Sequence, residues 1–175
     1  MSGKLVIIPT YNEKENIERI IRYVFQLDGN FHILVVEDNS PDGTAEIVKG
    51  LIKSFPGQLF IEARKGKLGL GTAYIHGFKW ALKRNYDYII EMDADFSHNP
   101  DDLSRLVEAC ENGADVAIGS RYVDNVIRVV NWPMGRVMMS YFASKYVKVI
   151  TGLKIADSTA GFVCYKRKVL DTLWF

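Results

Sequence analysis

Two aspartates and a serine stand at alternate positions shortly after an apolar run: Asp93, Asp95 and Ser97. At the end of a strand, this i, i+2 spacing turns both carboxylates toward the same side. Paired carboxylates with a nearby hydroxyl suit a hard divalent cation, Mg²⁺ or Mn²⁺, that keeps open positions for the oxygens of a diphosphate. For an isolated Asp-x-Asp, a solvated turn ahead of a helix would be the preferred interpretation.

A second group of polar residues follows two other apolar runs. Asp38 follows the run 33–36 with one residue between them, where a carboxylate can accept hydrogen bonds from a ribose or a base. Tyr11 and Glu13 follow the run 5–8 and could stack on a base and hydrogen-bond to it. The alternative is that these residues serve only their loops. We expect that alternative to hold for Asp42 and Thr44, which read as an Asx turn entering a helix.

The glycine-rich segment 66–71 (GKLGLG) opens a predicted helix. Its glycine spacing differs from the dinucleotide fingerprint, and no Lys-Ser/Thr pair follows as in a phosphate loop. The turn after the first apolar run reads PTYNE, where a dinucleotide-binding fold would carry glycines. Both observations argue against NAD binding and against a P-loop nucleotidase, so we interpret these glycines as a tight loop-to-helix turn.

Two arginines are candidates for phosphate recognition, because a guanidinium fork matches phosphate oxygens. Arg121 follows the apolar run 116–118, and Arg136 lies in a later amphipathic segment. For a lone arginine, surface solvation is the more common explanation. The histidines show neither metal-ligand spacing nor a partnered nucleophile, and we assign them no role. They are His32, His76 and His98.

The composition is that of one globular domain. The chain has 175 residues, of which 48% are hydrophobic and 25% charged, with a formal net charge of +1. This charge gives no reason to expect nucleic-acid binding, so anionic ligands must be held by placed residues. Cys110 and Cys164 are too few and too far apart for a disulfide framework or a zinc site. No apolar stretch is long enough to span a bilayer, and we expect a soluble, cytoplasmic chain.

The elements that must position these residues alternate along the chain. Short apolar runs at 5–8, 33–36, 59–61, 88–90 and 116–118 predict buried strands. Amphipathic stretches at 15–27, 44–55, 72–84 and 101–112 predict helices between them. Such alternation favours an α/β domain with a mainly parallel sheet and helices on both faces. Ligands bind at the carboxyl ends of such strands, which is where the polar residues gather.

The segment 132–153 carries many apolar and aromatic residues punctuated by basic ones. It could lie at a membrane surface with its basic groups toward lipid phosphates. The alternative, which we prefer slightly, is an amphipathic helix packed on the sheet.

In order along the chain, these strings resemble the inverting GT-A glycosyltransferases of family 2. The family resemblance rests on residues 9–13 (PTYNE), 37–44 (EDNSPDGT) and 93–95 (DAD). Four further strings resemble its dolichyl-phosphate mannosyltransferase branch. They are residues 67–77 (KLGLGTAYIHG), 95–100 (DFSHNP), 119–122 (GSRY) and 157–162 (DSTAGF).

The resemblance implies a GT-A fold over residues 1–175 and a set of site residues. The nucleoside would be held by Pro9, Tyr11, Glu13, Val36 and Asp38. Metal, diphosphate and sugar would be held by Asp93, Ala94, Asp95 and Arg121, with Ser97 as a further metal ligand. Asp95, Arg121 and Arg136 would be the catalytic residues, and Arg136, four residues after Trp132, would contact the acceptor phosphate.

The implied reaction is the transfer of mannose from GDP-mannose to a dolichyl or polyprenyl phosphate, with inversion, at the cytoplasmic face of a membrane. Two alternatives stay open: transfer of glucose or another sugar from UDP or GDP, and a binding module without activity. The resemblance also implies that family members continue beyond Phe175, with helices that add basic residues to the sites. Glu37 stands where the family usually has aspartate.

Overall fold

The computed structural model describes residues 3–120, 122–123, 126–127, 134–152, 155, 157 and 159–173, with only some of the side chains of helix 134–151. Its centre is a six-stranded sheet in the order β3-β2-β1-β4-β8-β5. The strands are β1 (Lys4–Thr10), β2 (Phe31–Glu37), β3 (Leu59–Ala63), β4 (Tyr88–Glu91), β5 (Val116–Ile118) and β8 (Val163–Lys166). The first four are mutually parallel, which confirms the predicted α/β class and mainly parallel sheet.

The strand β8 was not predicted. It runs antiparallel between β4 and β5, pairing Ile90 and Ala117 with Cys164. Its insertion places Val163, at the start of β8, beside Glu91, at the end of β4. The four-residue strand has no alternation long enough to stand out from its surroundings, and its pairing depends on two strands far away in sequence.

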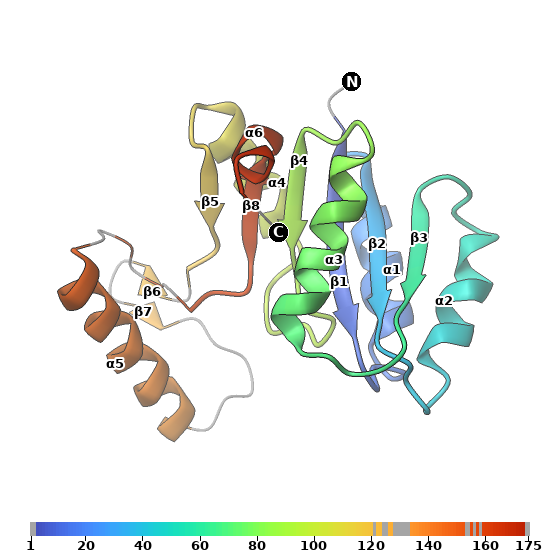
Figure 1. The fold of residues 1–175 in the computed structure, drawn as a ribbon, viewed down its shortest axis with the longest axis horizontal. Coiled ribbons are helices and arrows are strands. Elements are labelled where there is room, and N and C mark those ends of the chain that lie inside the picture. The colour runs from blue at the N-terminus through green and yellow to red at the C-terminus, as the bar shows by residue number, and fades with distance from the viewer. Residues whose placement is uncertain are drawn as a thin grey trace.

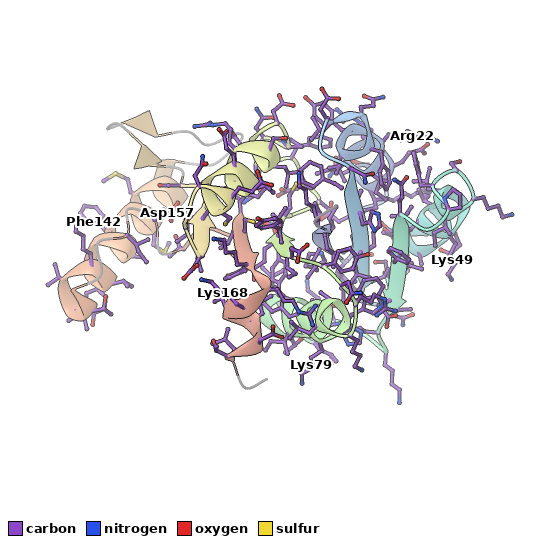
Figure 2. The ribbon with its side chains drawn as sticks, turned by 90° about the horizontal axis from the view of Figure 1, so that it is seen from above. Arg22, Lys49, Lys79, Phe142, Asp157 and Lys168 are labelled. Atoms are coloured by element: carbon purple, nitrogen blue, oxygen red, sulfur yellow. The ribbon has the colours of Figure 1, made fainter. Side chains whose placement is uncertain are left out.

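Helices cover both faces of the sheet (Figure 1). One face carries α1 (Ile17–Gln26), α2 (Thr44–Ile52) and α4 (Asp102–Glu111), whose buried residues share one core cluster. The other carries α3 (Leu70–Leu82) and α6 (Arg167–Asp171) with a second core. Figure 2 shows Arg22 of α1 and Lys79 of α3 on opposite sides of the sheet. The four predicted helices are confirmed, with ends shifted by a few residues, and both cysteines are buried and free.

The helix α5 (Met134–Thr151) lies apart from this sheet, beyond β5, beside the small hairpin of β6 (Tyr122–Val123) and β7 (Val126–Ile127) (Figure 1). Six of its apolar side chains are between 48% and 81% exposed: Met138, Met139, Phe142, Tyr146, Val149 and Ile150. The preferred prediction, that this segment packs on the sheet, is therefore wrong. In the part of the chain that is described, no helix combines the length and apolarity needed to cross a membrane.

The close approach of α3 to β1 depends on Gly77. A Cβ atom at this position would lie 2.7 Å from Cγ2 and 2.9 Å from Cδ1 of Ile7, a fully buried side chain that has no room to move. We expect Gly77→Ala to lower the free energy of unfolding by about 1–3 kcal/mol through overpacking.

The matched control is Gly50→Ala on α2, where an added Cβ meets nothing within 4 Å. There we expect a gain of about 0.5–1 kcal/mol, because alanine restricts the unfolded chain and favours the helix. Urea denaturation of both variants measures the difference. Equal shifts in the two variants would contradict the close packing of α3 on β1.

Candidate active site

The loops that follow β1, β2 and β4 meet at one edge of the sheet (Figure 1). This follows from the parallel pairing of β1 with both neighbours. Pro9 and Val36 are register partners near this edge, on β1 and β2. Ala94, between the two aspartates after β4, is buried. The structure therefore brings together the residues that the sequence assigns to the nucleoside and those that it assigns to the metal.

Side chains of the second loop hold the backbone of the first. The N–H groups of residues 12, 13 and 14 donate to Ser40 Oγ (3.0 Å), Thr44 Oγ1 (3.1 Å) and Asp42 Oδ2 (3.1 Å). The Thr44 N–H also donates to Asp42 Oδ1 at 3.0 Å, which confirms the predicted Asx turn. Asp42, Thr44 and Ser40 thus hold the two loops together.

Glu37 has a similar structural function at the end of β2. Its buried carboxylate accepts the N–H groups of Asn39 (2.9 Å) and Ser40 (2.6 Å). Asn39 has a positive φ of 57°, which asparagine tolerates better than most residues. Glutamate at this position therefore caps the turn that carries Asp38.

Asp38 forms a buried ion pair with Arg64. Its Oδ1 and Oδ2 accept Nε and Nη2 of Arg64 at 2.5 and 2.6 Å, and the side chains are 8% and 7% exposed. Arg64 Nη1 also donates to Thr72 Oγ1 at 2.8 Å. Each carboxylate oxygen keeps a second lone pair, so Asp38 is held in one orientation while it can still accept a ligand N–H or O–H.

Sequence reasoning missed Arg64. The signal was its position, one residue after β3 and therefore at the same sheet edge.

The loop before α3 contacts the loop after β1. Lys67 Nζ lies 4.5 Å from the ring centroid of Tyr11, whose side chain is exposed. Gly69, with φ +97°, turns the chain into α3 at Leu70, as the predicted loop-to-helix turn requires. The contact brings a positive charge to the edge that otherwise carries several carboxylates.

Asp93 is contacted by a residue of α3 and by a residue of the loop that follows β4. Tyr74, on α3, donates its hydroxyl to Asp93 Oδ1 at 3.2 Å. Burial, and then the charge of Asp93, raise the pKa of Tyr74 well above its ordinary value, so the hydroxyl stays a donor. His98 Nε2 lies 3.9 Å from Asp93 Oδ2, and its ring stacks on Phe162 with 5.1 Å between centroids.

Asp95 points outward from the same loop. It is exposed, and its Oδ1 accepts the backbone N–H of Ser97 at 2.9 Å. The intervening residue, Phe96, has a positive φ of 57°. The turn around Phe96 thus sets the direction of the Asp95 carboxylate.

Carboxylates concentrate on this edge. Burial is the largest cause that raises the pKa of Glu13, and Asp95, Asp93 and Asp42 raise it further, while a hydrogen bond from Asn16 opposes them. Glu13 accepts that bond at 3.2 Å. The Glu13 side chain therefore lies near these three carboxylates.

Strand β8 contacts the end of β4, next to Asp93. Burial, and then the charge of Asp93, raise the pKa of Glu91 to about 7, and a hydrogen bond from Tyr165 of β8 opposes this shift. The contacts of Tyr74, His98 and β8 with Asp93 and Glu91 were not predicted. The contacts of Tyr74 and β8 join segments that are distant in sequence, and no local motif marks them. His98 lies in the same loop as Asp93, but nothing in its spacing indicates the contact.

The donor set fits a divalent cation that is shared with a diphosphate. Within the described ranges, no three His, Cys, Asp or Glu side chains converge on one point. Mg²⁺ and related ions in nucleotide sites take one or two carboxylates, with phosphate and water oxygens completing the shell. Gly161 leaves space beside Asp93, since a Cβ there would lie 3.5 Å from Asp93 Oδ2. Asp93 and Asp95 offer such a partial shell.

Two of the predicted site residues cannot be placed. Arg121 lies outside the described residues, as does Trp132. Arg136 lies on α5, but its side chain is outside the described part.

Three curated relatives are similar to nearly the whole chain. Polyprenol monophosphomannose synthase from Mycolicibacterium smegmatis is 47% identical over 97% of this chain and 63% of its own length. Undecaprenyl-phosphate mannosyltransferase from Micrococcus luteus is 43% identical over 97% of this chain and 68% of its own length. Dolichol-phosphate mannosyltransferase from Pyrococcus furiosus is 39% identical over 95% of this chain and 47% of its own length. The chain thus spans between 47% and 68% of the length of these relatives.

Solved structures share the GT-A fold. Mannosyltransferase PcManGT from Pyrobaculum calidifontis, in complex with GDP-Man and Mn²⁺, matches with a TM-score of 0.68 at 19% identity, over 98% of this chain and 46% of that chain. Glucosyl-3-phosphoglycerate synthase from Mycobacterium tuberculosis, in complex with phosphoglyceric acid, matches with a TM-score of 0.71 at 20% identity, over 98% and 59%. The model of the family described as Glycosyl transferase family 2 matches residues 5–174. The chain belongs to glycosyl transferase family 2.

Proposed function

We propose that this chain is the catalytic part of an inverting, metal-dependent transferase that moves mannose from GDP-mannose to a polyprenyl or dolichyl phosphate. The observation that carries the proposal is the pair of carboxylates, Asp93 and Asp95, at the sheet edge where the nucleoside loops also end. One curated relative is named a polyprenol monophosphomannose synthase, and the other two are named mannosyltransferases of undecaprenyl phosphate and dolichol phosphate. The solved mannosyltransferase of the same fold holds GDP-Man and Mn²⁺.

The nucleoside of the donor would lie against the loops after β1 and β2. Pro9 and Val36 form the paired strand ends, and Tyr11 offers an exposed ring for stacking. Asp38, held by Arg64, presents a fixed acceptor for the N–H groups of guanine or for a ribose hydroxyl. Glu13 lies among the site carboxylates, next to the path from nucleoside to diphosphate.

Asp93 and Asp95 would hold Mg²⁺ or Mn²⁺, with the Ser97 hydroxyl as a further ligand and Ala94 against the sugar. Such a cation neutralises negative charge on a diphosphate leaving group. Tyr74 orients Asp93 through its hydrogen bond, and the Ser97 N–H orients Asp95. These two bonds keep the carboxylates aimed before a ligand arrives, which is what positioning requires.

In the proposed reaction, an oxygen of the lipid phosphate forms a bond to the anomeric carbon of mannose. The bond from that carbon to the diphosphate breaks on the opposite side, and GDP leaves with the electron pair. The acceptor phosphate is already anionic at neutral pH, so no strong general base is needed. Catalysis then consists mostly of positioning and charge stabilisation, with Arg121 beside the reaction centre and Arg136 on the acceptor phosphate.

The acceptor would be presented at a membrane surface on the cytoplasmic side. The six exposed apolar side chains of α5 support this, since their spacing puts them on one side of the helix that carries Arg136. Apolar contacts with lipid and a basic group near its phosphate are the usual combination at an interface. In Figure 2, Phe142 marks α5 at the end of the molecule opposite Lys49 of α2.

The test is the binding of GDP-mannose to the full-length protein, by calorimetry, with Mn²⁺ and with a chelator. We expect binding that depends on the metal and is stronger than that of UDP-glucose under the same conditions. Transfer of labelled mannose to polyprenyl phosphate in detergent then tests the acceptor.

Each arm of the experiment can contradict a different part of the proposal. A preference for UDP-glucose would overturn the mannose donor. Equal affinity in chelator would overturn the metal site. Hydrolysis of GDP-mannose without transfer to polyprenyl phosphate would overturn the acceptor.

A further inference from the structure

Phe96, between the metal-site residues Asp95 and Ser97, has a backbone conformation that phenylalanine rarely adopts. Its φ of +57° lies in the left-handed region, where the side chain of an L-residue crowds the backbone. The other non-glycine residues with positive φ in the described part of the chain are all asparagines, which tolerate this region: Asn12, Asn30 and Asn39. A bulky aromatic residue stays there only if the surrounding structure holds it.

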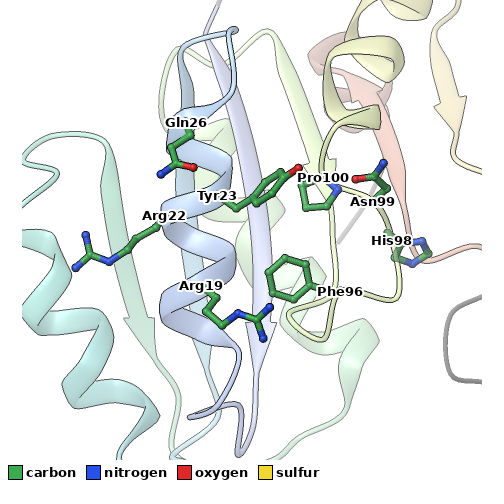
Figure 3. Close-up of a pocket in the computed structure, with 8 residues that line it drawn as sticks. All are labelled: Arg19, Arg22, Tyr23, Gln26, Phe96, His98, Asn99 and Pro100. Carbon is green, nitrogen blue, oxygen red and sulfur yellow. The ribbon is translucent and has the colours of Figure 1, made fainter.

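The side chain of Phe96 is held by α1. The guanidinium carbon of Arg19 lies 5.2 Å from the centroid of the Phe96 ring. The Tyr23 ring meets it edge-on, with 6.3 Å between centroids and planes at 86°. Arg19 and Tyr23 are four residues apart, so they lie on one side of the helix and bracket the ring (Figure 3).

The same contact extends along the loop to α4. The Tyr23 hydroxyl donates to Asp101 Oδ1 at 2.9 Å, so one residue of α1 contacts both ends of segment 96–101. This segment and α1 line a groove of about 750 Å³, which Figure 3 shows with Phe96 and Tyr23 on its wall.

The conformation of Phe96 determines where Asp95 points. The left-handed residue reverses the chain, so the Ser97 N–H reaches back to Asp95 Oδ1 at 2.9 Å. Two residues further on, His98 lies 3.9 Å from Asp93 Oδ2. With a right-handed or extended residue at position 96, both relationships would change.

We infer that Phe96, clamped by Arg19 and Tyr23, is a positioning residue that presets Asp95 and the loop to His98 for the metal-bound diphosphate. The inference rests on the proposed metal site. The binding energy of the ring on α1 offsets the cost of the left-handed backbone, and the loop is therefore aimed before the donor binds. The residues that hold Phe96, Arg19 and Tyr23, belong to α1, and α1 itself supplies no proposed metal ligand.

The experiment compares Phe96→Ala with Phe96→Gly in the full-length protein, measuring the affinity for Mn²⁺ in the presence of GDP by calorimetry. Alanine removes the clamp and still disfavours the left-handed backbone, so the loop should relax. We expect its affinity for Mn²⁺ to fall about 10- to 100-fold, as for other residues that orient metal ligands. Glycine removes the clamp but adopts positive φ freely, so its affinity should fall less than that of alanine.

Phe25→Ala is the matched control. Phe25 is also a partly buried aromatic residue of α1, but it stacks on Phe55, with 4.1 Å between centroids, away from the metal loop. It should lose stability while its affinity for Mn²⁺ stays at the wild-type value. Circular dichroism checks that each variant is folded. If Phe96→Ala does not fold, Tyr23→Ala, which removes one side of the clamp, should weaken Mn²⁺ binding relative to Phe25→Ala.

Three results would overturn the inference. The first is wild-type affinity for Mn²⁺ in both Phe96 variants. The second is an affinity in the glycine variant equal to or below that in the alanine variant, because then the backbone conformation does not matter. The third is a wild-type protein that binds GDP without any dependence on Mn²⁺, which overturns the metal site itself and this inference with it.

Discussion

Asp95→Ala is expected to abolish the metal-dependent part of GDP-mannose binding. The Asp95 carboxylate is exposed and oriented by the Ser97 N–H, and Asp93 is the other carboxylate of the pair. Residues that only orient a metal ligand contribute about 10- to 100-fold to affinity, so the loss of a direct ligand should exceed that range. Calorimetry with Mn²⁺ and with chelator measures the effect: the two titrations should become alike.

The control for this variant is Asp171→Ala. Asp171 is an exposed aspartate of α6, the helix that follows β8. Because β8 runs antiparallel to β4, it ends beside the start of β4, so α6 lies at the edge of the sheet opposite the candidate site. It should bind GDP-mannose with wild-type affinity in Mn²⁺. If Asp95→Ala also keeps the metal-dependent affinity, Asp95 is not a metal ligand, and the proposed site must be moved away from the end of β4.

Arg64→Met is expected to lower the free energy of unfolding by about 3–5 kcal/mol. The substitution keeps much of the side-chain volume but leaves the Asp38 carboxylate, 8% exposed, without its partner. Removing one member of a buried ion pair is costly, because the other charge stays out of water. Arg64 also donates to Thr72, so the first turn of α3 loses a hydrogen bond to the end of β3. Urea denaturation with an unchanged m value measures the loss.

Arg22→Met is the matched control on the surface. Arg22 pairs with Glu18 at 2.8 Å on α1, with side chains 49% and 50% exposed, and such pairs contribute about 0–1 kcal/mol. The double variant Asp38→Asn with Arg64→Met should recover part of the stability, because no unpaired charge remains. An equal loss of unfolding free energy in Arg64→Met and Arg22→Met would show that the buried ion pair does not stabilise the ends of β2 and β3.

Much of the fold follows from local patterns. Apolar runs of three to four residues between amphipathic stretches predict β1 to β5 and α1 to α4, because burial on both faces of a sheet and on one face of a helix leaves different periodicities. Parallel pairing then sends the carboxyl ends of these strands to one edge. For this reason, the sequence alone brought Tyr11, Asp38, Asp93 and Asp95 into one candidate site.

The tertiary structure decided what holds those residues in place. Arg64 reaches Asp38, Tyr74 reaches Asp93 and the clamp on Phe96 sets Asp95, each across a distance that no local pattern spans. The strand β8 joins the sheet between β4 and β5 and brings Phe162 against His98. Helix α5 stays apart from the sheet, although its apolar residues predict packing on it.

The physical reason is the same in each case. Local periodicity records which side of an element is buried, and this is determined within a few residues. The partner that covers the buried side depends on which strand edges and helix faces are free once the other elements have packed. A sequence therefore shows which residues at the strand ends could take part in chemistry. Only the packed sheet shows which other residue orients each of these side chains.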